Sequence, residues 1–278
     1  MSAREHSIYS KRGLRQNQIL QLLENNSAMS NYDLCNELSC SEATIRNDLR
    51  DLDKRGLIFR TRGGAAKLAS TNPNPLDNFS IQFRINSNAA LKEAVAGYLF
   101  SSGLIQPNQS IVIDMGSTCY MAAKYVSECD FPLSVATNSL NIANLMAGNH
   151  NISLALSGGI YYPEIDAFDT TSSLNLFSNM FFDYYFMGAN GISKSSGVTC
   201  TLQDPIDRMP VKRLLMSHSQ ATILLCDHTK INKTYMQGIC SVNDLNMIIT
   251  DDACSLEERE AFLDIGTKVA FAPVKNQF

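Results

Sequence analysis

Apolar residues recur at helical spacing in three short stretches near the start of the chain. Those over 14–25 predict a first helix. A second helix is predicted to begin after Ser30, a favourable N-cap that has Asp33 three residues later. A third is predicted between a further N-cap, Ser41, and Gly56, which stands where a glycine commonly ends a helix. The short break before Ser41 predicts a helix-turn-helix.

Two short apolar strands and a polar stretch follow these helices. Residues 57–68 predict a hairpin around two glycines. Residues 68–80 contain two prolines and three asparagines without a helical period, which is typical of a linker. We therefore expect a winged helix-turn-helix domain over 1–67, a linker over 68–80 and a larger domain over 81–278.

The larger domain alternates short apolar strands with helical segments. This alternation predicts an α/β fold with an open, mostly parallel sheet and helices on both faces. The expected strands cover residues 110–114, 132–137, 152–157, 184–188, 222–227, 246–250 and 268–273.

Charge is distributed unevenly between the two parts. Residues 1–70 contain 11 Lys and Arg against 8 Asp and Glu, a net charge of +3. The remaining residues contain 12 against 19, a net charge of −7, so that the whole chain carries −4. A basic head on an acidic body indicates that only the head approaches a polyanion.

Several classes of protein are excluded by composition. The sequence has no apolar run of about 18 residues, so no membrane span is expected. Its first residues lack the apolar core of a secretory signal. The eight cysteines form no C-x-x-C pair and have no His cluster beside them. Free thiols in a cytoplasmic protein are the expectation, with a structural zinc site as the lesser alternative. We expect no metal and no cofactor.

The helix over 41–55 is predicted to have one apolar face and one basic face. The apolar face carries Ile45, Leu49 and Leu52. The opposite face carries Ala43, Arg46, Asn47, Arg50 and Lys54, and the wheel places Asp48, Asp51 and Asp53 on the flanks. A solvated surface helix is the alternative interpretation. Three cations on one face, directly after a turn from another helix, favour double-stranded DNA as the partner.

Roles on DNA follow from position along this helix. Its N-terminal half reaches base edges, and later residues reach phosphates. Ser41, Thr44, Arg46 and Asn47 are therefore expected to read bases, and Arg50 and Lys54 to hold the backbone. Arg60 and Arg62 on the hairpin are expected to touch the adjacent groove or phosphates, and Lys11, Arg12 and Arg15 add positive charge. A winged helix that binds protein is a weaker alternative, because its outer face is basic.

The segment SEATIRNDLRDLDKRGLIFRTRGGA, residues 41–65, resembles the signature of the DeoR family of bacterial regulators. That signature reads S-x-x-T-[IV]-R-R-D-L-x-x-L-x-x-x-G and continues into a basic strand and a Gly-Gly wing. The matching residues are Ser41, Thr44, Ile45, Arg46, Asp48, Leu49, Leu52 and Gly56. Asn47 departs from the pattern, since it stands where the family has a second Arg.

Small polar residues and glycines follow five of the expected strands. In open α/β sheets, the carboxyl ends of the strands form the ligand-binding edge. A glycine turn into a helix N-terminus there suits an anion, although it is often only a capped turn. The candidate ligand residues are Asp114, Gly116, Ser117, Thr118, Thr137, Asn138, Ser139, Gly158, Gly159, Gly188, Asn190 and Lys230. Asp114 is equally compatible with bracing the loop.

These loops resemble the sensor domain of the same family, which in turn resembles ribose-5-phosphate isomerase. The resemblance implies that residues 116–118 hold a phosphate and that Lys230 is a second anchor. An isomerase needs a carboxylate base. Asn190 stands where the enzyme has a carboxylate, so we expect no enzyme, while Asp183, Asp204 and Asp207 keep an isomerase-like alternative open. His218 and His228 are expected to be structural.

Together these features predict a cytoplasmic, sequence-specific transcriptional regulator of a carbohydrate-use operon. The resemblance implies a repressor controlled by a phosphorylated sugar. One small helix-turn-helix contacts few base pairs, so a homo-oligomer, dimer or tetramer, is expected. The sugar, the operator and the direction of the ligand effect stay open.

Overall fold

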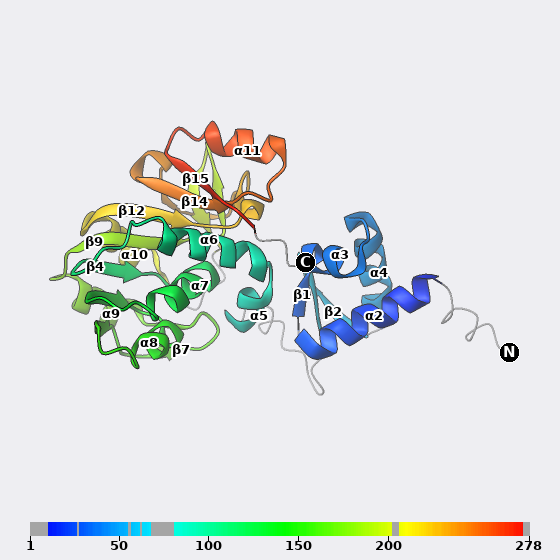
Figure 1. Cartoon of the computed structure of the whole chain (residues 1–278), viewed down its shortest axis with the longest axis horizontal. Coiled ribbons are helices and arrows are strands. Elements are labelled where there is room, and N and C mark those ends of the chain that lie inside the picture. Colours follow the sequence, from blue (N-terminus) through cyan, green and yellow to red (C-terminus); the bar gives the residue numbers. More distant parts are fainter. Residues whose placement is uncertain are drawn as a thin grey trace. The chain divides into compact units, whose positions relative to one another are not determined.

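The computed structural model describes residues 11–26, 28–54, 57–61, 63–67, 81–201 and 206–274 (Figure 1). The chain divides into two compact units, Met1–Ala89 and Ala90–Phe278. The predicted linker over 68–80 and Arg62 lie outside the described residues. None of the described helices is both long and apolar enough to cross a membrane.

The first unit is a winged helix-turn-helix, as predicted. Its helices are α2 (Lys11–Asn26), α3 (Asn31–Leu38), α4 (Glu42–Lys54) and α5 (Ile81–Asn86). Its strands β1 (Ala28–Ser30), β2 (Ile58–Thr61) and β3 (Gly64–Lys67) form an antiparallel sheet in the order β1-β3-β2. The three apolar residues expected on the core face of α4 are fully buried against α2 and α3 residues in one cluster.

Capping residues determine where α3 ends and where α3 and α4 begin. Ser30 and Asp33 form a reciprocal capping box at the start of α3, as their spacing predicts. Ser39 ends the same helix in a left-handed conformation with φ 48°. Ser41 then begins α4, where its hydroxyl oxygen accepts a hydrogen bond from the Thr44 N–H at 3.4 Å. These caps fix the turn between the two helices.

The second unit contains one seven-stranded parallel sheet. Its strands are β4 (Ser110–Ile113), β5 (Leu133–Thr137), β6 (Ile152–Leu156), β9 (Phe182–Gly188), β12 (Ser219–Leu225), β14 (Met247–Asp251) and β15 (Val269–Ala272). The order across the sheet is β15-β14-β12-β9-β4-β5-β6. Each of these strands lies where an apolar stretch predicted one, and the α/β prediction is confirmed.

Helices precede the first parallel strand and lie between later ones. They are α6 (Ala89–Ser101), α7 (Ser117–Val126), α8 (Leu140–Met146), α9 (Thr170–Phe177), α10 (Met209–Ser217) and α11 (Leu256–Leu263). Two smaller sheets were not predicted. One pairs β7 (Tyr161–Tyr162) with β8 (Ala167–Phe168), and the other joins β10 (Gly191–Ser193), β11 (Gly197–Cys200) and β13 (Gln237–Cys240).

The order in which the chain adds strands to the sheet reverses between β4 and β9. From β4 the chain adds β5 and β6 on one side, then returns to add β9, β12, β14 and β15 on the other. Ligands of open α/β sheets bind at such a switch point, outside the carboxyl ends of the strands. The loops after β4 and β9 are therefore the places to look for a ligand site.

Candidate functional sites

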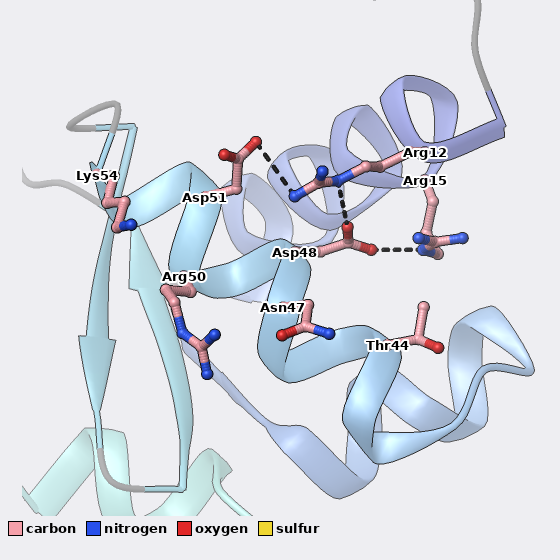
Figure 2. Close-up of a pocket in the computed structure, with 8 residues that line it drawn as sticks. All are labelled: Arg12, Arg15, Thr44, Asn47, Asp48, Arg50, Asp51 and Lys54. Carbon is pink, nitrogen blue, oxygen red and sulfur yellow. Dashed lines mark hydrogen bonds and ion pairs between the residues drawn. The ribbon is translucent and has the colours of Figure 1, made fainter.

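The outer face of α4 presents a row of polar and basic side chains (Figure 2). Arg46, Asn47, Arg50 and Lys54 are exposed, whereas Thr44 is half-buried. The hydroxyl groups of Thr44 and the exposed Ser41 lie 2.8 Å apart and are bonded to each other. All the predicted base-reading residues of this helix therefore lie near or on one accessible face.

Acidic residues on α4 differ from the expectation in two ways. Glu42 forms an ion pair with Arg46 at 2.7 Å, so the basic face includes an acid one turn away. Asp48 was expected on the flank, but its side chain is only 1% exposed. It accepts hydrogen bonds from the Nε atoms of Arg12, at 3.2 Å, and Arg15. A helical wheel of α4 alone could not predict this burial, because α2 packs over that side of α4.

The hairpin contributes Arg60, which is half-buried on β2. Its backbone N–H donates to Asp53 Oδ1 at 3.3 Å, which ties the wing to the end of α4. The wing cation Arg60 and the basic face of α4 thus belong to the same folded unit.

A buried polar cluster joins β4, β9 and α10 at the switch point. Asp114 and Lys212 are each 3% exposed, and the Lys212 ammonium donates to Asp114 Oδ2. The same carboxylate oxygen accepts the Gly188 N–H at 3.2 Å, and Lys212 also donates to the Gly188 carbonyl at 3.2 Å. Asp114 therefore braces the two strands, one of the two roles expected for it.

A small cavity lies beside this cluster. It leaves about 10 Å³ open to water-sized molecules, enough for about one water. Its described lining is Asp114, Met115, Asn138, Phe168, Thr170, Ile206, Arg208, Val211 and Lys212. Of the predicted ligand residues, only Asp114 and Asn138 line it.

Two cations at this cavity, Arg208 and Lys212, were missed by sequence reasoning. Arg208 is 8% exposed, and its burial lowers the pKa of the guanidinium. Only Asp114 supplies a carboxylate to the described lining of the cavity. The sequence offers little signal for either cation, because Lys212 is flanked by Val211 and Arg213, and Arg208 directly precedes α10. Neither cation follows a strand, where ligand residues of open sheets are expected.

The loop after β5 is held mostly by its own hydrogen bonds. Thr137 Oγ1 donates to the Ile113 carbonyl at 2.9 Å and accepts the Ser139 N–H at 3.1 Å. Ser139 Oγ caps α8 by accepting the Ile142 N–H at 3.1 Å, and it donates to the buried Asp166. These hydroxyls connect β4, β5 and α8, and Asn138 alone of the three predicted loop residues lines the cavity.

Gly116 begins α7 with φ 128° and without a side-chain cap. Ser117 is half-buried and Thr118 is buried in the first turn of that helix. The uncapped turn leaves backbone N–H groups at the helix start, as an anion site would require. The turn follows Met115, which lines the cavity.

Gly158, Gly159 and Asn190 have structural roles in their loops. Gly158 and Gly159 adopt φ values of 64° and 98°, and a side chain on Gly159 would collide with Asp169 and Ser172. Asn190 Oδ1 accepts the Thr201 N–H at 3.3 Å, and its own N–H donates to the Thr199 carbonyl at 3.1 Å. None of the three appears in the described lining of the cavity.

Lys230 lies in the short helix η2 (His228–Lys230) after β12. Its charge acts on Asp227, which is fully buried. Burial alone would raise the pKa of this carboxyl, but Lys230 and the buried Lys92 reverse the effect and lower it to about 2. The structure therefore sets Lys230 beside an acid and does not include it in the cavity lining.

The two histidines that were expected to be structural make buried or stacked contacts. His228 Nδ1 lies 2.6 Å from Asp251 Oδ1, and the His228 backbone N–H donates to the same carboxylate at 2.8 Å. His218 Nδ1 lies 3.0 Å from the Met180 carbonyl, and its ring stacks on Phe181. All eight cysteines are free. Within the described ranges, no group of three or more His, Cys, Asp or Glu residues could hold a metal ion.

Comparisons with known protein families cover both units. Residues 15–71 match the DeoR-like helix-turn-helix domain, and residues 87–252 match the DeoR C terminal sensor domain. The two matches have the same order as the two units: the first lies within Met1–Ala89 and the second lies almost wholly within Ala90–Phe278.

Individual proteins give the same result. The chain is similar to the HTH-type transcriptional regulator GolR of Listeria innocua, with 33% identity over 93% of this chain and 98% of the relative. It is 29% identical to the HTH-type transcriptional repressor GlcR of Bacillus subtilis, over 84% of this chain and 86% of the relative. A solved ribose 5-phosphate isomerase from Methanocaldococcus jannaschii is 15% identical, with a TM-score of 0.38, over 52% of this chain and 55% of that chain. A score of this size says nothing about activity.

Proposed function

Because the chain belongs to the DeoR family of transcriptional regulators, we propose that it switches a carbohydrate-use operon in response to a phosphorylated sugar. The effector part of this proposal rests on one observation. Two buried cations, Arg208 and Lys212, lie beside one carboxylate at the point where the strand order of the sheet reverses. Two buried cations at the ligand-binding edge of the sheet favour an anion there, because opposite charges attract each other more strongly in a buried site than in water.

The phosphate is proposed to bind between the start of α7 and these cations. Backbone N–H groups at residues 116–118 and the guanidinium of Arg208 together offer charge-assisted hydrogen bonds to phosphate oxygens. Asn138 and Thr170 supply polar groups for sugar hydroxyls at the cavity wall. The cavity is nearly closed, so the ligand would favour a more open state of this edge.

On the DNA side, α4 is proposed to enter the major groove. Ser41, Thr44, Arg46 and Asn47 would read bases, while Arg50, Lys54, Arg60 and Arg62 would hold phosphates. The exposure of the α4 side chains supports this assignment. The protein is proposed to act in the cytoplasm as a homo-oligomer, with residues 68–80 linking its domains, because one head contacts too few base pairs for useful specificity.

The relatives are regulators, and we propose that this chain likewise catalyses no sugar isomerisation. The amide of Asn190 cannot take a proton as a carboxylate would. The buried Asp114 is already paired with Lys212, which disfavours it as a base. The repressor name of the Bacillus relative supports repression for this chain.

A ligand screen tests the effector proposal. Thermal unfolding of the full chain is followed with pentose and hexose phosphates and, separately, with the free sugars. A phosphosugar that binds only the folded state at 100 times its Kd stabilises by about 2.7 kcal/mol. We expect stabilisation by at least one phosphosugar and none by its free form. Equal stabilisation by both forms, or by neither for every sugar, contradicts the proposal.

A further inference from the structure

A notch of about 420 Å³ lies between the start of α2 and the outer side of α4 (Figure 2). Four of its lining residues are cations, two from each helix: Arg12 and Arg15 from α2, and Arg50 and Lys54 from α4. Thr44 and Asn47 line it as well, together with Asp48 and Asp51. Four cations against two carboxylates give this concave surface a net charge of +2.

Both acids of the notch are engaged by α2. Asp48 accepts from Nε of Arg12 and of Arg15, and more weakly from Gln16 at 3.4 Å. Asp51 accepts from Gln16 Nε2 at 3.1 Å and lies 3.6 Å from Arg12 Nη2. The acids therefore face the arginines, and the floor of the notch, where Asp48 lies, is buried.

The arginines keep donors for a further partner. A guanidinium has five N–H donors in a planar fork, and the bonds to Asp48 use Nε of each arginine. The Arg12 side chain is 55% exposed and that of Arg15 is 22% exposed. A guanidinium already held in one orientation loses less freedom when it binds an anion.

We propose that this notch binds a backbone phosphate of DNA, and that Asp48 is the positioning residue that presents Arg12 and Arg15 to it. The proposal rests on the DNA-binding function of the family and adds α2 to the DNA surface, which otherwise consists of α4 and the wing. A phosphodiester between the two pairs of cations would gain charge-assisted bonds from both helices.

A purely structural role for Asp48 would lead to different effects on DNA binding. If the ion pairs only lock α2 against α4, removing an arginine changes stability without changing the number of phosphates neutralised. If the acid acts only through its charge, removing it strengthens binding to a polyanion. The positioning role alone predicts that loss of an acid weakens binding to DNA.

The test uses the full chain and a random-sequence duplex of about 30 base pairs, because phosphate contacts do not depend on sequence. Fluorescence anisotropy is measured across a salt series. Arg12→Gln is expected to reduce the slope of log Kobs against log salt by about one for each bound head, and Arg15→Gln likewise. Arg213→Gln, an exposed arginine of α10, is the matched control and should leave the slope unchanged.

Asp48→Asn provides the second measurement. It should weaken binding several-fold, although it removes a negative charge from the DNA side. Glu37→Gln removes the same charge from an exposed position of α3 in the same head and should bind as tightly as the parent or more tightly. If circular dichroism shows that Asp48→Asn unfolds the head, the salt slope of Arg12→Gln, a change at an exposed side chain, decides whether the notch binds phosphate.

The outcomes distinguish the DNA-binding function, the phosphate site in the notch and the positioning role of Asp48. A parent protein that does not bind the duplex contradicts the DNA-binding function itself. A parent that binds, with Arg12→Gln and Arg15→Gln retaining its full salt slope, overturns the notch alone. Asp48→Asn that binds more tightly than the parent overturns the positioning role.

Discussion

Lys212 on α10 donates a hydrogen bond to Asp114 at the end of β4, across 98 positions of the sequence, and both side chains are buried. Lys212→Met should therefore lower the free energy of unfolding by about 3–5 kcal/mol, because it leaves a buried carboxylate without its main partner. Urea denaturation of the second unit, followed by circular dichroism, measures the loss.

The double variant Asp114→Leu/Lys212→Met checks the cause of that loss. Removing both charges leaves no isolated charge, so the double variant should lose less stability than the two single variants together. Losses that add within about 0.5 kcal/mol would show that the two side chains act independently.

Arg208→Met should abolish the preference for a phosphosugar over its free form. We expect the parent to prefer the phosphosugar at least about tenfold, which corresponds to about 1.4 kcal/mol. Lys230→Ala is the matched comparison, because its charge already faces Asp227. Calorimetric titration with both sugar forms measures the ratio. A preference lost with Lys230→Ala and retained with Arg208→Met would place the phosphate beside Lys230, as the family resemblance implies.

Features set by neighbours along the chain could be predicted from the sequence. Ser30 and Asp33 are three residues apart, and they form their capping box within one turn of helix. The seven parallel strands are short apolar stretches between polar loops, and such stretches are visible without knowledge of their partners. The family signature over 41–65 depends in the same way on local spacing.

Features set by distant partners could not be predicted in this way. Asp48 looks like a flank residue until α2 places two arginines over it. Lys212 looks like a surface lysine until its buried carboxylate is known. Lys230 follows a strand as a ligand residue should, with Asp227 three residues before it, but the buried Lys92 that also acts on Asp227 comes from α6. A buried charge is explained by its partner, which periodicity does not reveal.

His228 should make stability depend on pH on the alkaline side. Burial alone would lower the pKa of its imidazole, but the hydrogen bond and charge of Asp251 outweigh burial and raise it above the usual 6.5. A group with a raised folded pKa contributes its full stability below the unfolded pKa, and the contribution is lost as pH rises through the folded pKa. The free energy of unfolding from this pair should thus be larger at pH 6 than at pH 9. His228→Gln should remove the dependence, and an unchanged pH profile in that variant would contradict the assignment.

Two adjacent glycines of the wing differ in the space that surrounds them. Gly64 pairs with Ser30 of β1 and Thr61 of β2. A Cβ atom on Gly64 would lie 2.7 Å from Ser30 Cα and closer still to the Met29 carbonyl oxygen, both of which are backbone. Gly64→Ala should therefore push β1 away from β3 and destabilise the head by about 1–3 kcal/mol. Since Ser30 also caps α3, the disturbance should reach the helix-turn-helix.

Gly63 is the matched control, because a Cβ atom there meets no atom of the described residues within 4 Å and its φ lies outside the positive range. Gly63→Ala should be neutral or should stabilise the head by up to about 1 kcal/mol, through a less flexible unfolded chain. Hydrogen exchange of the β1 and β3 amides in the full chain distinguishes separation of β1 from β3 in Gly64→Ala from the neutral or stabilising effect of Gly63→Ala. Faster exchange in Gly64→Ala alone, together with weaker DNA binding, is the expected result. Equal exchange in both variants would mean that β1 can move aside at little cost, and that the close approach of β1 and β3 does not hold the wing in place.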